Sequence, residues 1–401
     1  MQNFNIIWII GASQGLLLTL FLILKKDRAI NTPLIIFVFL TSVELLFQYI
    51  YAERVIFRYP HLLYLSEPFS MLSGPLIYLY SRNILLGRFI IRKTDLLIFI
   101  PFLLYFLYYL PAYNQSAEDK IFDIIAFYNS GIAWEENLYE WISEIIVNVP
   151  FLAYSVHLLN QYHKNIKCNF SDISKISYTV VRNLLIVSTI MYIIELLIVL
   201  LAFLHLQIAS YLNSFLYAFI IAIVYIIGYD ALVRKNNEII VLAHEPQTKI
   251  KSGSDLNALT ENRPTEQRSK YEKNVLPDTR AKEISKKILN CINKEKPYRN
   301  PELRLNDLSE LIGEHPNNVS QVLNDLFKKN FYDFINFYRV EEAKVLLKSP
   351  NYKNFTITAI GFEVGFNSKT AFFTAFKKFT NSTPAKFQKA YSTHNQQDDM
   401  F

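Results

Sequence analysis

The chain has 401 residues, of which 51% are hydrophobic and 15% aromatic, and its formal net charge is +6. Nearly all of the apolar excess lies before Tyr229, and the chain after it is polar and rich in lysine, which is typical of a membrane part followed by a soluble part. The two cysteines lie far apart in these two parts, which argues against a disulfide framework and fits a reducing compartment. The sequence shows no metal-ligand cluster, no Gly-rich phosphate loop and no GxSxG motif, so no cofactor, metal site or enzyme activity is expected.

Seven runs in the first part are long and apolar enough to cross a bilayer, which takes roughly 20 residues. They lack the polar stripe that helices of a soluble domain carry. The first run has basic residues after it but none before it and no small-residue cleavage site, so it is expected to be a retained span. We place the spans near residues 4–24, 32–51, 69–86, 96–113, 141–159, 184–204 and 208–229.

Lysine and arginine set the expected orientation of these spans. The loops after the first, third, fifth and seventh spans carry most of these residues, whereas the loop between the fourth and fifth spans is acidic. Basic loops stay in the cytoplasm. The chain is therefore expected to be a multi-pass protein of the cytoplasmic (inner) membrane, with its N-terminus outside and its C-terminal half in the cytoplasm.

Polar side chains are few within the spans. Glu44 and Glu195 are expected near the middle of the membrane, and His157 lies in the fifth span. A carboxylate in lipid is costly and normally faces the bundle interior or a cavity. These residues therefore form either a ligand or ion site, or neutral acids that pack helix against helix.

The composition of residues 231–282 predicts a linker. Glu, Lys, Asn, Ser and Thr dominate there, and four interspersed Pro and Gly residues break any long helix. If flexible, some 50 residues span roughly 40 Å. This is enough for a tethered domain to reach DNA near the membrane, and such a segment is also a plausible protease target.

Two short helical patterns meet across a tight turn at Gly365-Phe366, within residues 355–387. Apolar residues recur at helical spacing on both sides of this turn, and two helices joined by a short Gly-containing turn are typical of a helix-turn-helix. This stretch resembles the DNA-binding domain of the AraC family of bacterial transcription regulators. The matching residues are Ile357, Ile360, Val364-Gly365-Phe366, Phe372, Phe376-Lys377-Lys378 and Thr383-Pro384.

A second copy of the pattern lies upstream, in residues 305–327. Asn306 is the expected N-cap of its first helix, and Pro316 suits the first turn of the next helix. Val319, Val322, Leu323 and Leu326 are expected to face the core. The outer faces of the two second helices then predict the DNA contacts, and Asn and Gln there can each pair with adenine in the major groove: Asn317, Asn318, Ser320, Gln321 and Asn324 in the first copy, and Lys369, Thr370, Phe373, Thr374, Lys377 and Lys378 in the second. Phe373 either contacts a thymine methyl or is a surface aromatic.

Residues 332–349 between the copies are in helical register and predict a rod about 27 Å long. Successive major grooves on one face of DNA are about 34 Å apart, so one monomer can reach two grooves, an arrangement that the resemblance also implies. Arg339 belongs to the matching connector pattern and is interpreted as structural. Between Glu283 and Tyr391 there are 17 Lys and Arg against 11 Asp and Glu, a basic balance that fits phosphate binding.

The resemblance covers roughly residues 282–391, and four positions depart from the family pattern. Lys328 and Asn381 stand where the family usually has glycine, and asparagine tolerates the left-handed backbone. Gly361 and Ser309 stand where it usually has alanine. Both residues are small, so the helix crossing is expected to survive.

The sequence therefore predicts an all-α protein: a seven-helix transmembrane domain (1–230), a linker (231–282), an AraC-type DNA-binding domain (283–391) with two helix-turn-helix motifs, and a tail (392–401). The expected function is membrane-bound, sequence-specific transcription regulation, with the membrane half sensing a signal or anchoring the protein. Expected partners are double-stranded DNA, RNA polymerase, the lipid bilayer and an unidentified small-molecule or protein signal, and a homodimer is a possible state. The alternative is a membrane transporter or channel with an accessory helix-turn-helix domain.

Overall fold

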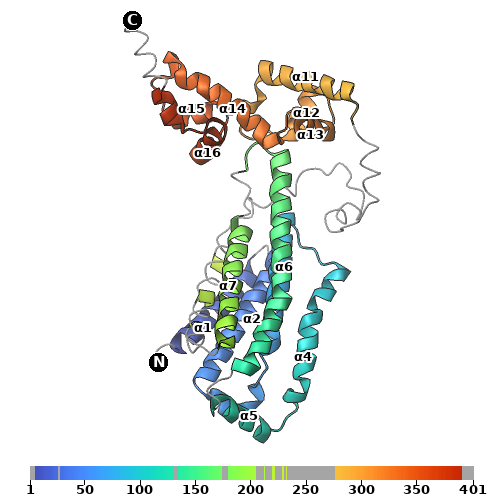
Figure 1. The fold of residues 1–401 in the computed structure, drawn as a ribbon, viewed down its shortest axis with the longest axis vertical. Coiled ribbons are helices and arrows are strands. Elements are labelled where there is room, and N and C mark those ends of the chain that lie inside the picture. Colours follow the sequence, from blue (N-terminus) through green and yellow to red (C-terminus); the bar gives the residue numbers. More distant parts are fainter. Residues whose placement is uncertain are drawn as a thin grey trace. The chain divides into compact units, whose positions relative to one another are not determined.

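The computed structural model describes residues 5–25, 28–129, 134–173, 179–204 and 276–390, together with residues 212, 219–221, 228, 229 and 232. Contacts divide the chain into two compact units. The N-terminal unit comprises residues 1–161 and 177–245, and the C-terminal unit comprises residues 162–176 and 246–401. The described residues are almost entirely helical (Figure 1).

The helices of the first part of the chain are α1 (Asn5–Leu24), α2 (Arg28–Ala52), α3 (Ser73–Leu86), α4 (Ile100–Tyr113), α5 (Ala117–Asn129), α6 (Trp134–Asn169) and α7 (Thr179–Phe203). Five helical stretches in the described residues are long and apolar enough to cross a membrane: Ile6–Leu24, Arg28–Ala52, Lys93–Tyr113, Trp141–Asn169 and Val181–Leu201. They match five of the seven predicted spans.

The predicted third span has a different form. It consists of a six-residue 3-10 helix, Glu67–Leu72, followed by α3, which has only 14 residues and buries twelve of them. At 1.5 Å per residue, α3 is about 21 Å long, which is short for a bilayer crossing. The predicted span at 208–229 lies almost entirely outside the described residues, so the count of seven stays a prediction.

Large apolar side chains of the spanning helices point outward. Leu17, Leu20 and Phe21 of α1 are each about half exposed, and so are Ile193 and Leu196 of α7. Small residues let α1 approach α2 closely at one point, since a Cβ on Gly15 would collide with the Ser42 side chain. Apolar exteriors with small residues between helices are what lipid-facing helices use, because lipid gives no hydrophobic drive for helix association.

The C-terminal unit contains α11 (Asp278–Glu295), α12 (Leu305–Ile312), α13 (Pro316–Asp325), α14 (Phe331–Lys348), α15 (Ile357–Glu363) and α16 (Lys369–Thr380). Figure 1 shows α12 and α13 near one end of α14, and α15 and α16 near the other. α11 starts at Asp278, within the stretch predicted as linker, and the predicted tail lies outside the described residues.

Two separate apolar cores lie along α14. Phe331, Phe334 and Ile335 from its first half pack with α11, α12 and α13. Ala343 and Leu347 from its second half pack with α15 and α16. One continuous helix therefore carries both helix pairs, as the sequence predicted for residues 332–349.

Two details of the first pair differ from the prediction. The N-cap of α12 is Arg304, not Asn306, and the Asp307 carboxylate accepts a 2.8 Å hydrogen bond from the Arg304 backbone N–H. A carboxylate at the third helical position in this way satisfies the backbone N–H of the N-cap residue, as in a capping box. Leu326 is about half exposed rather than buried, because α13 ends at Asp325 and Leu326 falls after its last turn.

Two of the residues that depart from the family pattern have the left-handed backbone that the usual glycine would adopt. Lys328 (φ 53°) and Asn381 (φ 55°) are both left-handed, where the family usually has glycine. Gly361 lies in the second core, and a Cβ there would come within 2.6 Å of the Phe372 ring. Glycine at position 361 thus lets α15 approach α16 closely.

Candidate functional site

The outward face of α13 is amide-rich and its inward face is aliphatic. Val319, Val322 and Leu323 are fully buried in the first core. At the start of the helix the His315 ring accepts a 3.2 Å hydrogen bond from the Asn317 N–H, and Pro316 takes the first helical position, as predicted. The predicted contact residues all keep some exposure: Asn317 and Asn324 are exposed, and Asn318, Ser320 and Gln321 are half-buried.

The outward face of α16 is cationic and its inward face is aromatic. Phe372 and Phe376 are fully buried in the second core. The Ser368 hydroxyl caps the helix by accepting a 3.2 Å hydrogen bond from the Ala371 N–H. The predicted contact residues on this helix are largely accessible: Lys369, Thr370, Thr374, Lys377 and Lys378 are exposed, and Phe373 is half-buried.

Two residues of α16 are engaged in contacts that the sequence did not indicate. The Phe373 ring packs edge-on against Phe372 at 5.7 Å and carries the Lys369 ammonium 5.5 Å above its centre. Lys378 makes a 2.7 Å ion pair with Asp333 at the start of α14. Phe373 therefore contributes to packing as well as surface, and Lys378 ties α16 to the connector.

Arg339, in the middle of α14, holds the connector to the turn before α12. It is 1% exposed, and its guanidinium donates hydrogen bonds to the backbone oxygens of Tyr298 at 2.6 Å and Asn300 at 2.8 Å. Burial lowers the pKa of Arg339 to about 10, while the nearby Asp172 carboxylate opposes the shift. The guanidinium thus stays charged at neutral pH, in the structural role that the sequence analysis assigned to it.

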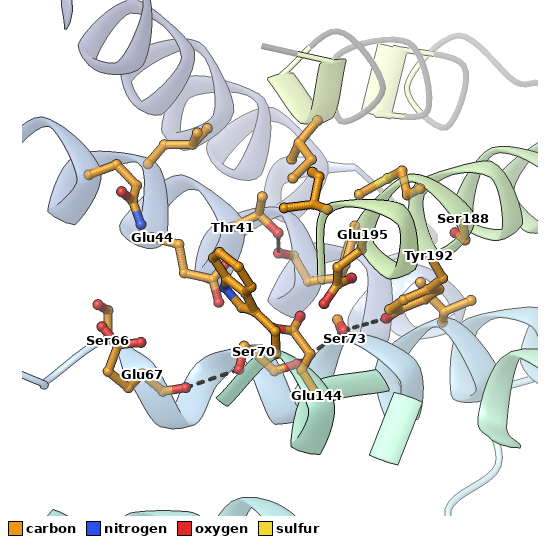
Figure 2. A pocket seen from close by; sticks show the side chains of 18 of the residues that line it. Thr41, Glu44, Ser66, Glu67, Ser70, Ser73, Glu144, Ser188, Tyr192 and Glu195 are labelled. Carbon is orange, nitrogen blue, oxygen red and sulfur yellow. Dashed lines mark hydrogen bonds between the residues drawn. The ribbon is translucent and has the colours of Figure 1, made fainter. Parts of the chain in front are cut away.

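A cavity of about 170 Å³ lies within the N-terminal unit, and four carboxylates line it (Figure 2). Glu44 comes from α2, Glu67 from the 3-10 helix before α3, Glu144 from α6 and Glu195 from α7. One oxygen of Glu195 is buried and has no hydrogen-bond partner among the described residues. Two of the three predicted membrane-site residues, Glu44 and Glu195, thus meet in one cavity although they are far apart in the sequence.

The polar wall of the cavity is built by contacts between helices. The hydroxyls of Ser73 and Tyr192 lie 3.0 Å apart (Figure 2). The Asn148 side chain accepts a 2.8 Å hydrogen bond from the Gly74 N–H and donates one to the Ser70 carbonyl. A Cβ on Gly74 would collide with Asn148, so glycine there lets α6 lie close to α3.

His157, the third predicted membrane-site residue, does not line this cavity. It is exposed on α6, where its ring lies 2.7 Å from the Gln161 amide nitrogen and stacks with Tyr154. The cavity instead includes Glu67 and Glu144, which the sequence analysis did not select. Both lie at the ends of apolar stretches, where a glutamate is normally expected at the membrane–water interface.

The described residues contain no group of three His, Cys, Asp or Glu side chains placed to hold a metal ion. Cys168 and Cys291 are both free thiols.

Residues 308–390 match the family described as Helix-turn-helix domain. A 98-residue stretch is 35% identical to an uncharacterised HTH-type transcriptional regulator of Staphylococcus aureus (strain COL), covering 24% of this chain and 13% of the relative. A 56-residue stretch is 45% identical to another uncharacterised HTH-type transcriptional regulator, from Pseudoalteromonas carrageenovora, covering 14% of this chain and 30% of the relative.

The matched stretches cover only 13% and 30% of the length of these relatives, and the family match lies within the C-terminal unit. No solved structure matches the chain. Residues 308–390 nevertheless run from α12 to the end of the described helices. The chain therefore carries a helix-turn-helix domain of the kind found in transcriptional regulators.

Proposed function

We propose that this chain is a membrane-bound, sequence-specific transcription regulator of AraC type, without enzymatic activity. The observation that carries the proposal is a combination in one chain: the described residues hold five helical stretches fit to span a membrane, and they also hold a helix-turn-helix domain with two helix pairs on one connector. A regulator anchored in this way acts on DNA that approaches the cytoplasmic face of the membrane.

In this proposal α13 and α16 are recognition helices that read two successive major grooves of double-stranded DNA. The 18 residues of α14 make a connector about 27 Å long, which is comparable to the 34 Å between grooves. Asn317 and Gln321 supply amides suited to adenine, and Lys369 suits a guanine edge or a phosphate. Bound in this way, the domain recruits RNA polymerase, as a monomer or as a homodimer.

The DNA contacts are tested by Asn317→Ala, Gln321→Ala and Lys369→Ala in the full chain. Each should weaken binding to a specific site by about 1–3 kcal/mol. Asn290→Ala and Lys286→Ala, exposed positions on α11, are matched controls and should change little. Equal losses on specific and random duplexes would remove these residues from base reading.

We place the signal input of the membrane half in the cavity that holds Glu44 and Glu195. The support is that a carboxylate within spanning helices is costly and is retained mostly where it binds a ligand, an ion or a partner group. Glu195→Gln keeps the shape of the side chain and removes the charge. A sensing role predicts an altered promoter response with unchanged membrane insertion, whereas an anchoring role predicts no change in response.

The same carboxylates are what favour the rival hypothesis, a transporter or channel with an accessory domain. Deletion of residues 1–230 separates the two. A retained promoter response supports a regulator whose membrane half anchors or senses. A transport defect with normal transcription supports the rival.

The proposed topology puts the N-terminus outside and the helix-turn-helix domain in the cytoplasm. Cysteine labelling tests it in a background with Cys168 and Cys291 changed to serine. A membrane-impermeant maleimide should label Ser116→Cys in intact cells and Arg88→Cys only after permeabilisation. The reverse pattern would invert the topology.

The proposal as a whole is tested by genome-wide DNA occupancy of the tagged full chain together with fractionation of the same cells. Discrete promoter peaks with only full-length, membrane-bound protein are the expected result. Peaks accompanied by a short soluble species would instead mean release by proteolysis within residues 231–282. An absence of discrete peaks under several growth conditions would contradict the proposal.

A further inference from the structure

Residues 170–172, which directly follow α6, lie against the helix-turn-helix domain within the C-terminal unit. Phe170 pairs with Arg304 in an isolated antiparallel bridge, and the Ser171 N–H donates a 3.1 Å hydrogen bond to the Leu303 carbonyl. The Arg304 guanidinium covers the Phe170 ring at 5.5 Å. The segment therefore lies directly beside the residues that lead into α12, joined to them by this bridge.

Arg339 holds the same segment from α14. Its guanidinium donates to the Ser171 carbonyl at 3.2 Å and to the Ser171 hydroxyl at 3.1 Å, and both residues are only 1% exposed. A buried guanidinium needs acceptors for its N–H groups, because an unpaired buried charge is costly. Ser171 thus shares this role with Tyr298 and Asn300 of the domain itself.

Asp172 reaches the second helix pair. Its carboxylate accepts a 2.6 Å hydrogen bond from the Asn367 side chain, which also donates to the Pro301 carbonyl. Asn367 stands immediately before Ser368, the N-cap of α16. The three residues 170–172 consequently contact the domain at the N-terminal ends of both α12 and α16.

In the proposed function, DNA phosphates bind near these same helix ends. Helix N-termini attract anions through their free N–H groups and dipole, and side chains and backbone groups there make much of the phosphate contact. Asp172 puts a negative charge beside the start of α16, and Phe170 covers the cationic side chain at the start of α12. A carboxylate that accepts a hydrogen bond from an amide donor resembles a phosphate oxygen in its charge and in its hydrogen bonding.

We propose that residues 170–172 are an autoinhibitory docking segment that competes with DNA phosphates for the N-terminal ends of α12 and α16. The proposal rests on the proposed function and names its regulation. Because the segment follows α6 without a break, and α6 also carries Glu144 of the cavity, movement of α6 is the means by which the segment is withdrawn. DNA binding and docking then exclude one another.

The first experiment measures DNA affinity of the full chain in lipid nanodiscs, with a duplex taken from an occupied promoter and a random duplex of equal length. Asp172→Ala should bind the promoter duplex roughly tenfold more tightly, since it removes a charge-assisted hydrogen bond that holds the segment. Glu310→Ala is the matched control because it removes an exposed carboxylate from α12, and it should change affinity far less.

A purely structural role of the segment predicts the opposite sign. If residues 170–172 only stabilise the domain, Asp172→Ala lowers the thermal stability of the C-terminal unit and weakens DNA binding. Unchanged or weaker binding by Asp172→Ala, with wild type still bound to the promoter duplex, overturns autoinhibition and leaves the proposed function intact. If no variant distinguishes the promoter duplex from the random one, the proposed function itself fails.

A disulfide lock gives a second test. Phe170→Cys and Arg304→Cys are combined in a background with Cys168 and Cys291 changed to serine, and each single variant is the control. The oxidised double variant should lose DNA binding, and reduction should restore it to the level of the reduced protein. Failure of the bond to form, or full binding by the oxidised protein, overturns the proposal.

Discussion

The two helix pairs at the ends of α14 share one plan but are built from different side chains. The core behind α13 is mostly aliphatic, with Val319, Val322 and Leu323, whereas the core behind α16 is aromatic, with Phe372 and Phe376. The outer face of α13 presents amides, and that of α16 presents lysines. The common plan fixes where the outer faces lie, and the composition of each face sets the chemistry that it presents at the surface.

The turns of the two pairs also differ, in how much space surrounds the turn glycine. Gly313 (φ 67°) ends α12 with open space around the position of a Cβ. Gly365 (φ 100°) lies against the backbone oxygens of Tyr298 and Arg299, so that a Cβ would collide with both. The turn of the second pair therefore packs against backbone of the domain at its glycine, whereas the turn of the first pair is held to α11 by ion pairs of Glu314 with Arg280 and Lys287.

The largest expected effect comes from the aromatic core. Phe372→Ala should destabilise the C-terminal unit by about 3–5 kcal/mol, because it leaves a large cavity. Val319→Ala removes less apolar surface and should cost about 1.5–2 kcal/mol. Hydrogen exchange of α14–α16 amides in the full chain measures both, and equal losses would abolish the contrast between the cores.

The next largest contrast is expected between alanine substitutions at the two turn glycines. Gly365→Ala combines left-handed strain of about 1–2 kcal/mol with a collision against backbone atoms that cannot move away independently. Gly313→Ala introduces only the left-handed backbone strain, because a Cβ at this position has no atom within 4 Å. Thermal unfolding of the two variants should rank Gly365→Ala well below Gly313→Ala, and a similar melting temperature would show that the second turn relaxes.

Ion pairs join α14 to the segment before α12 and to α16, and they give a pH-dependent contrast. Burial alone would raise the pKa of Glu342, but the hydrogen bonds from Arg299 and Lys296 hold this pKa below its ordinary value. Its stabilising contribution is therefore full above the unfolded-state pKa and is lost as the pH falls through the lowered folded-state pKa. Glu342→Gln should cost about 1–2 kcal/mol at neutral pH.

Asp333, which pairs with the half-exposed Lys378, is the counterpart at the second pair. Asp333→Asn should cost less than about 1 kcal/mol, because solvent screens the pair. Urea unfolding at pH 7 and at pH 3.5 compares the two variants with wild type. The difference between Glu342→Gln and wild type should shrink at the lower pH, and a constant difference would show that the charge of Glu342 is not what stabilises.

The smallest effect is a gain in stability. Lys328 follows the first pair with a left-handed backbone (φ 53°), a conformation that costs a non-glycine residue about 1–2 kcal/mol. Lys328→Gly relieves that strain but adds freedom to the unfolded chain, so we expect a net gain of about 0.5–1 kcal/mol. Asn381→Gly at the second pair should gain less, since asparagine tolerates this backbone, and an equal gain would remove that distinction.

The sequence was most informative where a local pattern decides a local structure. The periodicity of residues 332–349 predicted α14, and Pro316 and Ser368 mark the starts of α13 and α16. The prediction was wrong where two residues compete for the N-cap position of a helix. Asn306 has a good capping side chain, but Arg304 takes the N-cap because Asp307 satisfies its N–H from inside the helix.

The membrane half shows the same division. Apolar runs located five stretches fit to span a bilayer, because length and composition are properties of the chain alone. The short, buried form of α3 was not predicted in this way, since the run of 69–86 has the length of a span and is mostly apolar. Its burial depends on neighbours such as Asn148, which lies on a distant helix.

By itself, then, the sequence determined the helices, the basic and apolar halves and the outward faces of α13 and α16, because each follows from the order of neighbouring residues. Only the tertiary structure decided that four glutamates from separate segments share one cavity and that His157 does not line it. The same holds for Ser171 and Asp172, which meet Arg339 and Asn367 across more than 160 residues of chain. Contacts of this kind depend on how helices pack, and no periodicity within a segment records them.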